Sequence, residues 1–308
     1  MNECDARHGA IVARPAGDNP TVRKTIPLVI LLTLVWGTNW PLFPIATREV
    51  SVWTFRSICL VGSGVALLLL ARARGESLFI AREHWKTLVA ASLAYLVIWN
   101  VASTYAAMLI PSGQAAILGF TMPLWTALLA WAFMGQRPTP RVLLALAIGG
   151  AGVLLLIWNG ISAYAKAPLG FGLGLLAGVG WAVGTLILKR APVPGSPFVT
   201  TGWQLLVAAV PMSVAAFAVG GGRWFTPSAT TVAVIAYITL VPMAMGNAAW
   251  FRIVGMLPAN IAGLSSVMVP VVAMIAGAIV HHEPLGPVQW ASMVCCAAGV
   301  GLALQRKA

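Results

Sequence analysis

Charged side chains are scarce in this chain. Only 8% of its 308 residues are Asp, Glu, Lys or Arg, whereas 59% are hydrophobic and the mean hydropathy is +0.89. A water-soluble domain of this length needs many more polar side chains to cover its surface. The composition therefore excludes the soluble classes and predicts a protein embedded in a lipid bilayer.

Basic residues outnumber acidic ones, but they do not form a nucleic-acid-binding surface. The net charge of +12 comes mostly from short connections between apolar segments, and aromatic and basic residues do not alternate on any polar face. Such a distribution is typical of the signals that orient membrane proteins. We expect contacts with lipid and with a small molecule, and none with nucleic acid.

Metal, redox and nucleotide motifs are also missing. The cysteines, Cys4, Cys59, Cys295 and Cys296, show no CxxC spacing, which argues against a disulfide framework or a zinc site. Residues 281–283 (HHE) have a metal-like composition, but adjacent histidines do not share a helix face. No GxxxxGK[ST] segment is present to bind ATP phosphates, although an ATPase on a separate chain would leave no trace here. We expect no metal and no cofactor.

Apolar stretches of membrane-spanning length fill most of the chain. A bilayer core requires about 20 predominantly apolar residues per helix. Ten such stretches cover approximately residues 27–46, 51–71, 87–109, 112–133, 142–160, 169–188, 198–219, 229–251, 259–280 and 288–304. The sequence predicts an all-α polytopic membrane protein with ten transmembrane helices.

The positions of the basic residues predict the orientation. Fifteen of the 19 Lys and Arg residues lie in 7–24, 72–86, 137–141, 189–190, 252 and 306–307. The remaining connections hold only Arg48, Lys166 and Arg223, and Arg56 falls inside the second stretch. Because Lys and Arg are enriched in cytoplasmic loops, both termini are predicted to be cytoplasmic. Residues 1–25 are then a flexible tail, 161–168 a periplasmic linker and 305–308 a cytoplasmic C-terminus.

The chain carries the same pattern twice. Residues repeated 147 positions later (258 − 111 = 147) are Asn100, Pro111, Pro123, Pro140 and Gly152, which recur as Asn247, Pro258, Pro270, Pro287 and Gly299. Residues 26–160 and 169–304 are therefore predicted to be two five-helix repeats. Because five is odd, the repeats must be inverted relative to each other, an arrangement typical of secondary transporters.

Several local sequences resemble one transporter family. They are residues 36–41 (WGTNWP), residues 54–57 (TFRS) and the two proline-rich stretches that begin at Pro111 and Pro258. With the duplicated layout, they resemble the EamA branch of the drug/metabolite transporter superfamily, and most closely its bacterial aromatic amino-acid exporters. One difference is that the acidic residue usual after the fourth and ninth spans is present as Glu283, whereas Gln136 takes the equivalent place in the first half.

This resemblance implies a protein of the bacterial inner membrane that works by alternating access. It implies a substrate cavity between the repeats, near the middle of the membrane. The first, third, fourth, sixth, eighth and ninth spans would line the cavity, and the fifth and tenth would act as scaffold. We expect a monomer that transports amino acids.

Rare polar and aromatic side chains within the stretches show where an aqueous path could run. At helical spacing they can hydrogen-bond the polar part of an amino acid and stack against its ring. The candidate substrate-binding residues are Trp36, Asn39, Trp40, Tyr95, Trp99, Gln114, Thr121, Trp125, Trp181, Thr185 and Asn247. Each alone could equally serve helix packing or, for Trp and Tyr, the membrane interface. Together they favour a cavity, because Trp99, Trp125 and Trp181 fall near the middle of their stretches.

Other residues have candidate roles in movement or packing. Pro123 and Pro270 occupy equivalent places, remove a backbone hydrogen bond and are candidate hinges. Arg56 is either an anchor that reaches the outer surface with its long side chain or a gating or substrate-binding residue. Gly180 and Gly184 form a GxxxG pattern, which indicates close helix packing.

The sequence leaves more than one function open. An exporter or facilitator of amino acids is favoured, and a transporter of another small metabolite, drug or nucleoside is the alternative. An intramembrane enzyme based on residues 263–266 (GLSS) is disfavoured, because the serine would need a base and the nearest histidines lie at the membrane edge; no catalytic residue is assigned. With no Asp or Glu in the middle of a stretch, we expect facilitated diffusion down the substrate's gradient, or coupling through sites that the sequence does not reveal.

Overall fold

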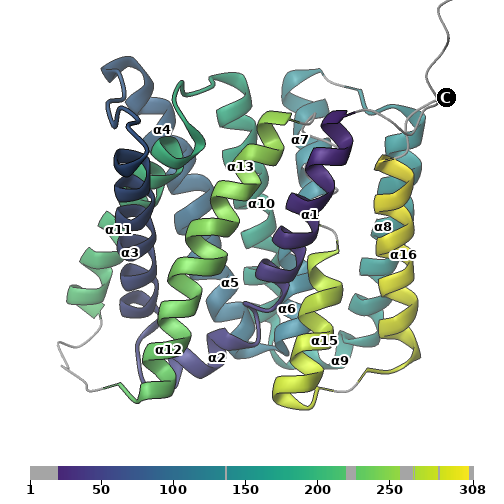
Figure 1. The fold of residues 1–308 in the computed structure, drawn as a ribbon. Helices are drawn as coiled ribbons and strands as arrows, with labels where there is room; N and C mark the ends of the chain where they lie inside the picture. Colours follow the sequence, from purple (N-terminus) through teal and green to yellow (C-terminus); the bar gives the residue numbers. More distant parts are fainter. Residues whose placement is uncertain are drawn as a thin grey trace, which may run out of the picture.

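The protein is a bundle of helices in every part that the structure describes (Figure 1). The computed structural model describes residues 20–135, 137–219, 227–256, 266, 268–283 and 285–304. No strand occurs within these ranges, which confirms the all-α prediction for them.

The first half contains α1 (Pro20–Gly37), α2 (Leu42–Thr47), α3 (Val52–Ala73), η1 (Arg82–His84), α4 (Trp85–Ala91), η2 (Ser92–Val97), α5 (Ile98–Leu109), α6 (Ser112–Gly119), α7 (Met122–Met134) and α8 (Pro140–Asn159). The second half contains α9 (Ile161–Lys166), α10 (Pro168–Arg190), α11 (Pro197–Val219), α12 (Ala229–Ile238), η3 (Thr239–Gly246), α13 (Asn247–Met256), α15 (Val269–His281) and α16 (Pro287–Leu304).

Within the described residues, eight helices or runs of helices are long and apolar enough to cross a membrane. They are Pro27–Thr47, Val52–Ala73, Arg82–Leu109, Ser112–Met134, Pro140–Asn159, Pro168–Arg190, Pro197–Val219 and Ala229–Ile253. These eight coincide closely with the first eight predicted stretches. The shorter apolar helix α15 and the helix α16 fall within the other two, and residues 257–265 of the ninth stretch lie outside the described residues. The chain is a multi-pass membrane protein.

The outward surface of the bundle is apolar. Phe133, Trp158 and Phe217 are 75%, 77% and 83% exposed, respectively. An apolar surface on this scale would favour association or aggregation in water but matches the hydrocarbon core of a bilayer.

Several spans are interrupted helices. The first breaks between Gly37 and Leu42, and the fourth breaks after Gly119, with Pro123 in the first turn of α7. The third and eighth contain the π-helices η2 and η3, and Pro242 lies inside η3. Breaks at Pro and Gly, and π-helical turns, leave backbone groups that other parts of the protein must satisfy. Such positions within membranes are found where the backbone is buried in protein or lines a cavity.

The sequence duplication is visible in the element boundaries. The π-helices begin at Ser92 and at Thr239, which is 147 positions later (92 + 147 = 239). The helices α7 and α15 end in left-handed residues at equivalent places, Gly135 with φ 65° and His282 with φ 55°. A left-handed residue is a common way to end a helix, and glycine adopts it without strain. The second copy makes the same turn with a histidine.

The bundle contains two long helix pairs, and a further helix packs closely against the third span. α3 packs along α11, and α8 packs along α16. α10 lies against α5 and η2, where a Cβ on Gly184 would lie 2.4 Å from the Cβ of Tyr95 and one on Gly180 would lie 2.7 Å from the carbonyl oxygen of Ala94. The close packing predicted from the GxxxG pattern is confirmed.

The predicted tail, linker and C-terminus can be compared with the helix boundaries only in part. The helix α1 begins at Pro20, within the predicted tail of residues 1–25, and residues 1–19 lie outside the described part. The predicted linker 161–168 contains the short helix α9. Gln136, Arg223, residues 263–265 of the disfavoured enzyme motif and residues 305–308 also lie outside the described residues.

Candidate functional site

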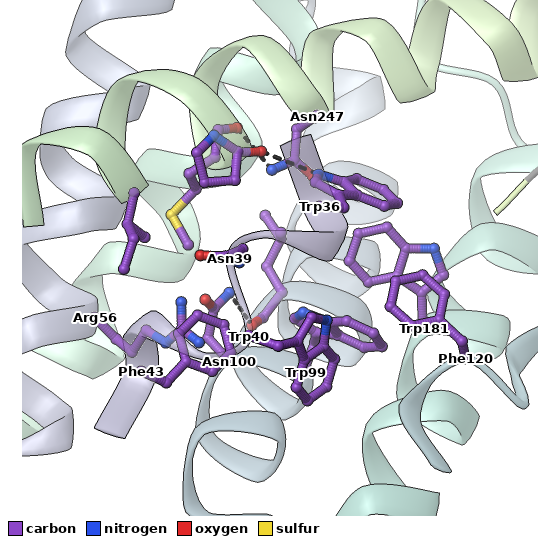
Figure 2. A pocket seen from close by; sticks show the side chains of 14 residues that line it. Trp36, Asn39, Trp40, Phe43, Arg56, Trp99, Asn100, Phe120, Trp181 and Asn247 are labelled. Atoms are coloured by element: carbon purple, nitrogen blue, oxygen red, sulfur yellow. Dashed lines mark hydrogen bonds between the residues drawn. The ribbon is translucent and has the colours of Figure 1, made fainter. Parts of the chain in front are cut away.

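A pocket lies inside the bundle (Figure 2). Its walls come from α1, α2, α3, η2 and α5 of the first half and from α10, α12, η3 and α13 of the second. The predicted site residues that line it are Trp36, Asn39, Trp40, Arg56, Trp99, Trp181 and Asn247. We call this space the central pocket.

Aromatic rings form one wall of the central pocket. The ring centroids of Trp99 and Trp181 are 4.8 Å apart, those of Trp36 and Trp181 are 5.4 Å apart, and those of Trp40 and Trp99 are 5.9 Å apart. All three pairs meet edge to face, an arrangement that adds about 0.5–1.5 kcal/mol per pair beyond burial of area. The wall is therefore rigid and apolar, and it offers both ring faces and ring edges.

Trp36 also joins the two halves of the chain directly. Its Nε1 donates to the carbonyl oxygen of Pro242 at 3.0 Å, and both residues line the central pocket. The carbonyl lies in the π-helix η3, where the regular hydrogen-bond pattern is altered. The indole N–H therefore satisfies a backbone group at the break and fixes the orientation of the Trp36 ring.

Two asparagines, one from each half, present acceptor atoms to the central pocket. Nδ2 of Asn100 donates to the carbonyl oxygen of Leu96 at 2.7 Å, and Nδ2 of Asn247 donates to that of Met243, also at 2.7 Å. These bonds fix which way each amide is turned. Both Oδ1 atoms are buried and have no hydrogen-bond partner among the described residues.

Two further polar groups of the central pocket are buried without a partner in the described structure. They are Oδ1 of Asn39, an acceptor, and Nε1 of Trp181, a donor. Buried polar atoms in native proteins are nearly always hydrogen-bonded. A set of unpartnered acceptors and donors around one space is suited to a small polar molecule that binds there.

Arg56 lies in the central pocket and not at the surface. Its side chain is 1% exposed, its guanidinium carbon lies 4.0 Å from the ring centroid of Phe43, and its Nε donates to Oγ1 of Thr104 at 2.6 Å. The expectation that Arg56 anchors the helix by reaching the outer surface is therefore wrong. The helix turns this residue inward, where the Phe43 ring covers the guanidinium.

Tyr95 and Thr185 were predicted to bind substrate, but they lie behind the wall. The Tyr95 hydroxyl donates to Oε1 of Gln204 on α11. The centroid of the Tyr95 ring lies 5.2 Å from that of the Trp181 ring. Thr185 donates to the carbonyl oxygen of Trp181, one turn earlier in α10, at 2.8 Å. Both residues support the Trp181 side of the wall and do not line the central pocket.

Gln114, Thr121 and Trp125 do not line the central pocket either. Nε1 of Trp125 donates to Oγ1 of Thr121 at 3.0 Å, and Gln114 has a buried Oε1 without a partner among the described residues. Thr121 and Pro123 line a second pocket at the α6–α7 break, bounded by α8 and Gly299. Of the three predicted residues on the fourth span, Thr121 alone lines this second space.

The predicted hinges occupy matching places at helix starts. Pro123 lies in the first turn of α7, and Pro270 lies in the first turn of α15. Proline is tolerated there because a first-turn N–H has no partner within its helix. The hinge role itself stays a prediction.

The central pocket also contains residues that were not among the candidates. They are Phe43, Leu96, Asn100, Phe120, Ile238, Pro242 and Met243. Asn100 could have been found from the sequence, because it is the 147-residue counterpart of the candidate Asn247. Phe43 follows one helix break and Phe120 lies within another, and the hydropathy pattern does not give the positions of these breaks.

One end of the bundle, at the bottom of Figure 1, is held together by contacts between the halves. Nε2 of His281, at the end of α15, donates to the carbonyl oxygen of Pro41 at 2.6 Å. Glu283 accepts hydrogen bonds from the backbone N–H and the hydroxyl of Ser112, at 3.0 and 2.8 Å, and from the N–H of Gly113 at 3.4 Å. These bonds cap the N-terminus of α6 with a carboxylate of the other half.

A second carboxylate links two connections at the same end. Glu49, between α2 and α3, accepts a hydrogen bond of 2.8 Å from the backbone N–H of Ser228, which caps α12. This bond, with those from the side chains of Ser228 and Thr231, lowers the pKa of Glu49 below its ordinary value of 4.5. The charged form of Glu49 thus favours the folded connection.

Comparison with known sequences identifies one matching family. A sequence model of the EamA-like transporter family matches residues 23–158 and 168–305. These two matched stretches fall on the two halves predicted from the 147-residue shift.

Individual relatives are distant but align over most of their length. The chain is 24% identical to "Uncharacterized transporter YvbV" of Bacillus subtilis, covering 85% of each chain. It is 23% identical to "Uncharacterized inner membrane transporter YedA" of Escherichia coli, covering 88% of each. It is 24% identical to "Probable amino-acid metabolite efflux pump" of Escherichia coli, covering 90% of this chain and 94% of that one.

A known crystal structure has a similar fold. The two structures superpose with a TM-score of 0.72 at 19% sequence identity, covering 91% of this chain and 97% of the other. At this identity the similarity shows a shared fold.

Proposed function

This chain belongs to the EamA-like transporter family, and from that premise we propose that it is a secondary transporter that carries amino acids, aromatic ones among them, across the bacterial inner membrane. A relative named as a probable amino-acid metabolite efflux pump and relatives named as inner membrane transporters support this assignment. The family and these names point to a transporter and not to an enzyme.

The observation that carries the proposal is the chemistry of the central pocket. An amino acid with an aromatic side chain has a flat apolar part and a compact charged part. The pocket has a matching division, with tryptophans on one wall and the unpartnered polar atoms of Asn39, Asn100 and Asn247 nearby. Aromatic faces and edges bind rings, and amide oxygens accept hydrogen bonds from an ammonium group.

Alternating access is the mechanism that this arrangement supports best. We infer ten spans in two inverted five-helix repeats, with both termini in the cytoplasm and the substrate site between the repeats. Opening the end held by His281 and Glu283 would require their bonds to Pro41 and Ser112 to break. The helix starts at Pro123 and Pro270 are the proposed hinges of that movement.

We propose that transport occurs by facilitated diffusion, driven by the concentration gradient of the substrate. No Asp or Glu is among the described residues that line the central pocket, so a carboxylate proton relay has no residues there. A facilitator works in either direction, and the substrate gradient then decides between export and uptake.

Uptake into proteoliposomes tests the proposal. Purified protein should accelerate entry of radiolabelled phenylalanine over protein-free vesicles, with or without a proton gradient. Trp99→Ala and Trp181→Ala should slow that entry, because each removes part of the aromatic wall, whereas Trp158→Ala changes a 77% exposed residue and serves as the matched control.

Competition in the same assay separates amino acids from other cargo. Unlabelled tyrosine and tryptophan should compete with phenylalanine, and nucleosides or a cationic drug should not. Inhibition by the drug or nucleoside alone would favour the alternative of another small solute. Entry no faster than in empty vesicles for every solute would refute a transport function.

A further inference from the structure

Arg56 has no carboxylate partner among the described residues. The acidic residues of that part of the chain are Glu49, Glu76, Glu83 and Glu283, and each is bonded elsewhere: to Ser228, to Arg74 and Ser196, to His84 and to Ser112, respectively. The chain's other acidic residues, Glu3, Asp5 and Asp18, precede the described residues. Within the described structure, the buried guanidinium therefore carries an uncompensated positive charge.

The surroundings hold this charge in a fixed position. Nε of Arg56 donates to Oγ1 of Thr104, which in turn donates to the carbonyl oxygen of Asn100, both at 2.6 Å. The rings of Phe43 and Phe55 lie 4.0 and 4.8 Å from the guanidinium carbon. Cation–π contacts stabilise the charge only in part, and a buried cation without an opposite charge is strongly unfavourable.

One end of the guanidinium has no hydrogen-bond partner among the described residues. Nη2 of Arg56 is buried and has no hydrogen-bond partner in the described structure, and Arg56 lines the central pocket. Figure 2 shows Arg56, Asn39 and Asn100 on one side of this space, with Trp99 and Trp181 across from them. The residue with the unpartnered donor and the residues with the unpartnered acceptors therefore share one side of the pocket.

We propose that Arg56 is the carboxylate-binding residue of the central pocket and that its missing counter-charge is the carboxylate of the transported molecule. A guanidinium pairs with a carboxylate through parallel N–H donors, and few other side-chain groups do so as well. The neighbouring amide oxygens of Asn39 and Asn100 bind the ammonium group, and the tryptophans bind the side chain. The inference rests on the proposed transport of amino acids.

A carboxylate-binding Arg56 makes the pocket selective for the charge of the substrate. The pocket accepts a zwitterion, whose negative end neutralises Arg56, and it rejects the corresponding cation, which adds a second positive charge. Thr104 is a positioning residue, because it orients the guanidinium without contacting the ligand.

Phenylalanine and phenylalaninamide form the pair of probes, since the amide differs only in having an uncharged carboxamide in place of the carboxylate. Binding is measured by the change in tryptophan fluorescence of the purified full-length protein, and uptake is measured in proteoliposomes. The wild-type protein should bind phenylalanine at least about tenfold more tightly than the amide, as expected for charged hydrogen bonds. Arg56→Gln should lose that preference through weaker phenylalanine binding, with amide binding unchanged or improved.

Matched variants separate this effect from general damage. Arg48→Gln makes the same change at an exposed arginine in the connection before α3 and should leave both affinities unchanged. Thr104→Val should raise the KM for phenylalanine several-fold and leave amide binding unchanged. Thr104→Val decides the question if Arg56→Gln does not fold.

The outcomes distinguish this inference from the proposed function. Equal affinity of the wild-type protein for both probes, or phenylalanine selectivity that survives Arg56→Gln and Thr104→Val, would overturn the role of Arg56 while leaving amino-acid transport intact. A wild-type protein that neither binds nor transports any amino acid would refute the proposed function, and the Arg56 assignment with it. Thermal stabilisation by chloride and not by phenylalanine, lost in Arg56→Gln, would instead show a structural anion site and overturn the inference.

Discussion

Asn100 and Asn247 make the same hydrogen bond in the two halves of the chain. Each side-chain N–H₂ donates at 2.7 Å to the carbonyl oxygen four residues earlier, at Leu96 and at Met243. Each of these carbonyls belongs to a π-helix, η2 or η3, at equivalent positions of the duplication. The two halves therefore contribute matching acceptor oxygens to the central pocket, at sites where the helix geometry is altered in the same way.

These oxygens should contribute to substrate affinity in similar measure. Asn247→Leu and Asn100→Leu each remove an acceptor while nearly preserving side-chain size, so each should weaken phenylalanine binding by about five- to tenfold, the value of one hydrogen bond. The change is measured by tryptophan fluorescence titration. Asn159→Leu, at the exposed end of α8, should have no effect. Unchanged affinity in both pocket variants would show that the oxygens do not contact substrate.

The duplication made part of this site predictable. A polar residue in an apolar stretch costs free energy, so one that recurs after 147 residues marks a place with a role in both copies. Asn247 was predicted to bind substrate, and the same argument would have found Asn100. Hydropathy gave the first eight spans to within a few residues of their ends, because about 20 apolar residues are needed to cross the bilayer.

The sequence did not predict whether an individual side chain points into the central pocket or away from it. Tyr95 belongs to a polar and aromatic stripe, but its hydroxyl binds Gln204, a residue 109 positions away on α11. Depth in the membrane alone did not decide whether Arg56 turns to the outer surface or inward. In the structure Arg56 turns inward and contacts Phe43, which lies on α2 just after the break in the first span. Rotation about a helix axis is set by tertiary contacts that a single sequence does not contain.

Glu283 should stabilise the contact between the halves at their shared end. Glu283→Ala removes the bonds to Ser112 and Gly113 and should lower the unfolding free energy in detergent by about 1–2 kcal/mol, as expected for partly exposed charged hydrogen bonds. Ser112→Ala should cost less, because the backbone N–H groups still donate. Glu83→Ala, at a carboxylate that is 77% exposed, is the control. Equal effects of Glu283→Ala and Glu83→Ala would contradict a specific cap.

The bond between Glu49 and Ser228 predicts a pH dependence of stability. The pKa of Glu49 is lower in the folded protein than its ordinary value of 4.5, so its carboxylate stabilises the fold above pH 4.5. This contribution is lost as pH falls through the lowered pKa. Glu49→Gln keeps an acceptor oxygen but not the charge. The wild-type protein should therefore unfold at a higher temperature than the variant at pH 6 to 7, and the difference should vanish in acid. A difference that grows in acid would have the wrong sign.

The glycines of α10 allow a sharp test of how the wall of the central pocket is supported. A Cβ on Gly184 would lie 2.4 Å from the Cβ and 2.7 Å from the Cδ1 of Tyr95, whereas nothing lies within 4 Å of one on Gly172. Gly184→Ala must therefore push α10 away from η2 and should lower the unfolding free energy by about 1–3 kcal/mol, the usual cost of overpacking. Gly172→Ala changes an exposed position of the same helix and should be neutral or stabilising by up to about 1 kcal/mol.

The same pair of variants should differ in phenylalanine binding, because the ring centroids of Tyr95 and Trp181 are 5.2 Å apart. Displacing Tyr95 moves the Trp181 ring, which meets Trp99 edge to face, so Gly184→Ala should weaken phenylalanine binding, and Gly172→Ala should not. Thermal unfolding and fluorescence titration of both proteins give the two readouts. If Gly184→Ala is as stable and binds as tightly as Gly172→Ala, then the close approach of α10 to Tyr95 does not position the aromatic wall.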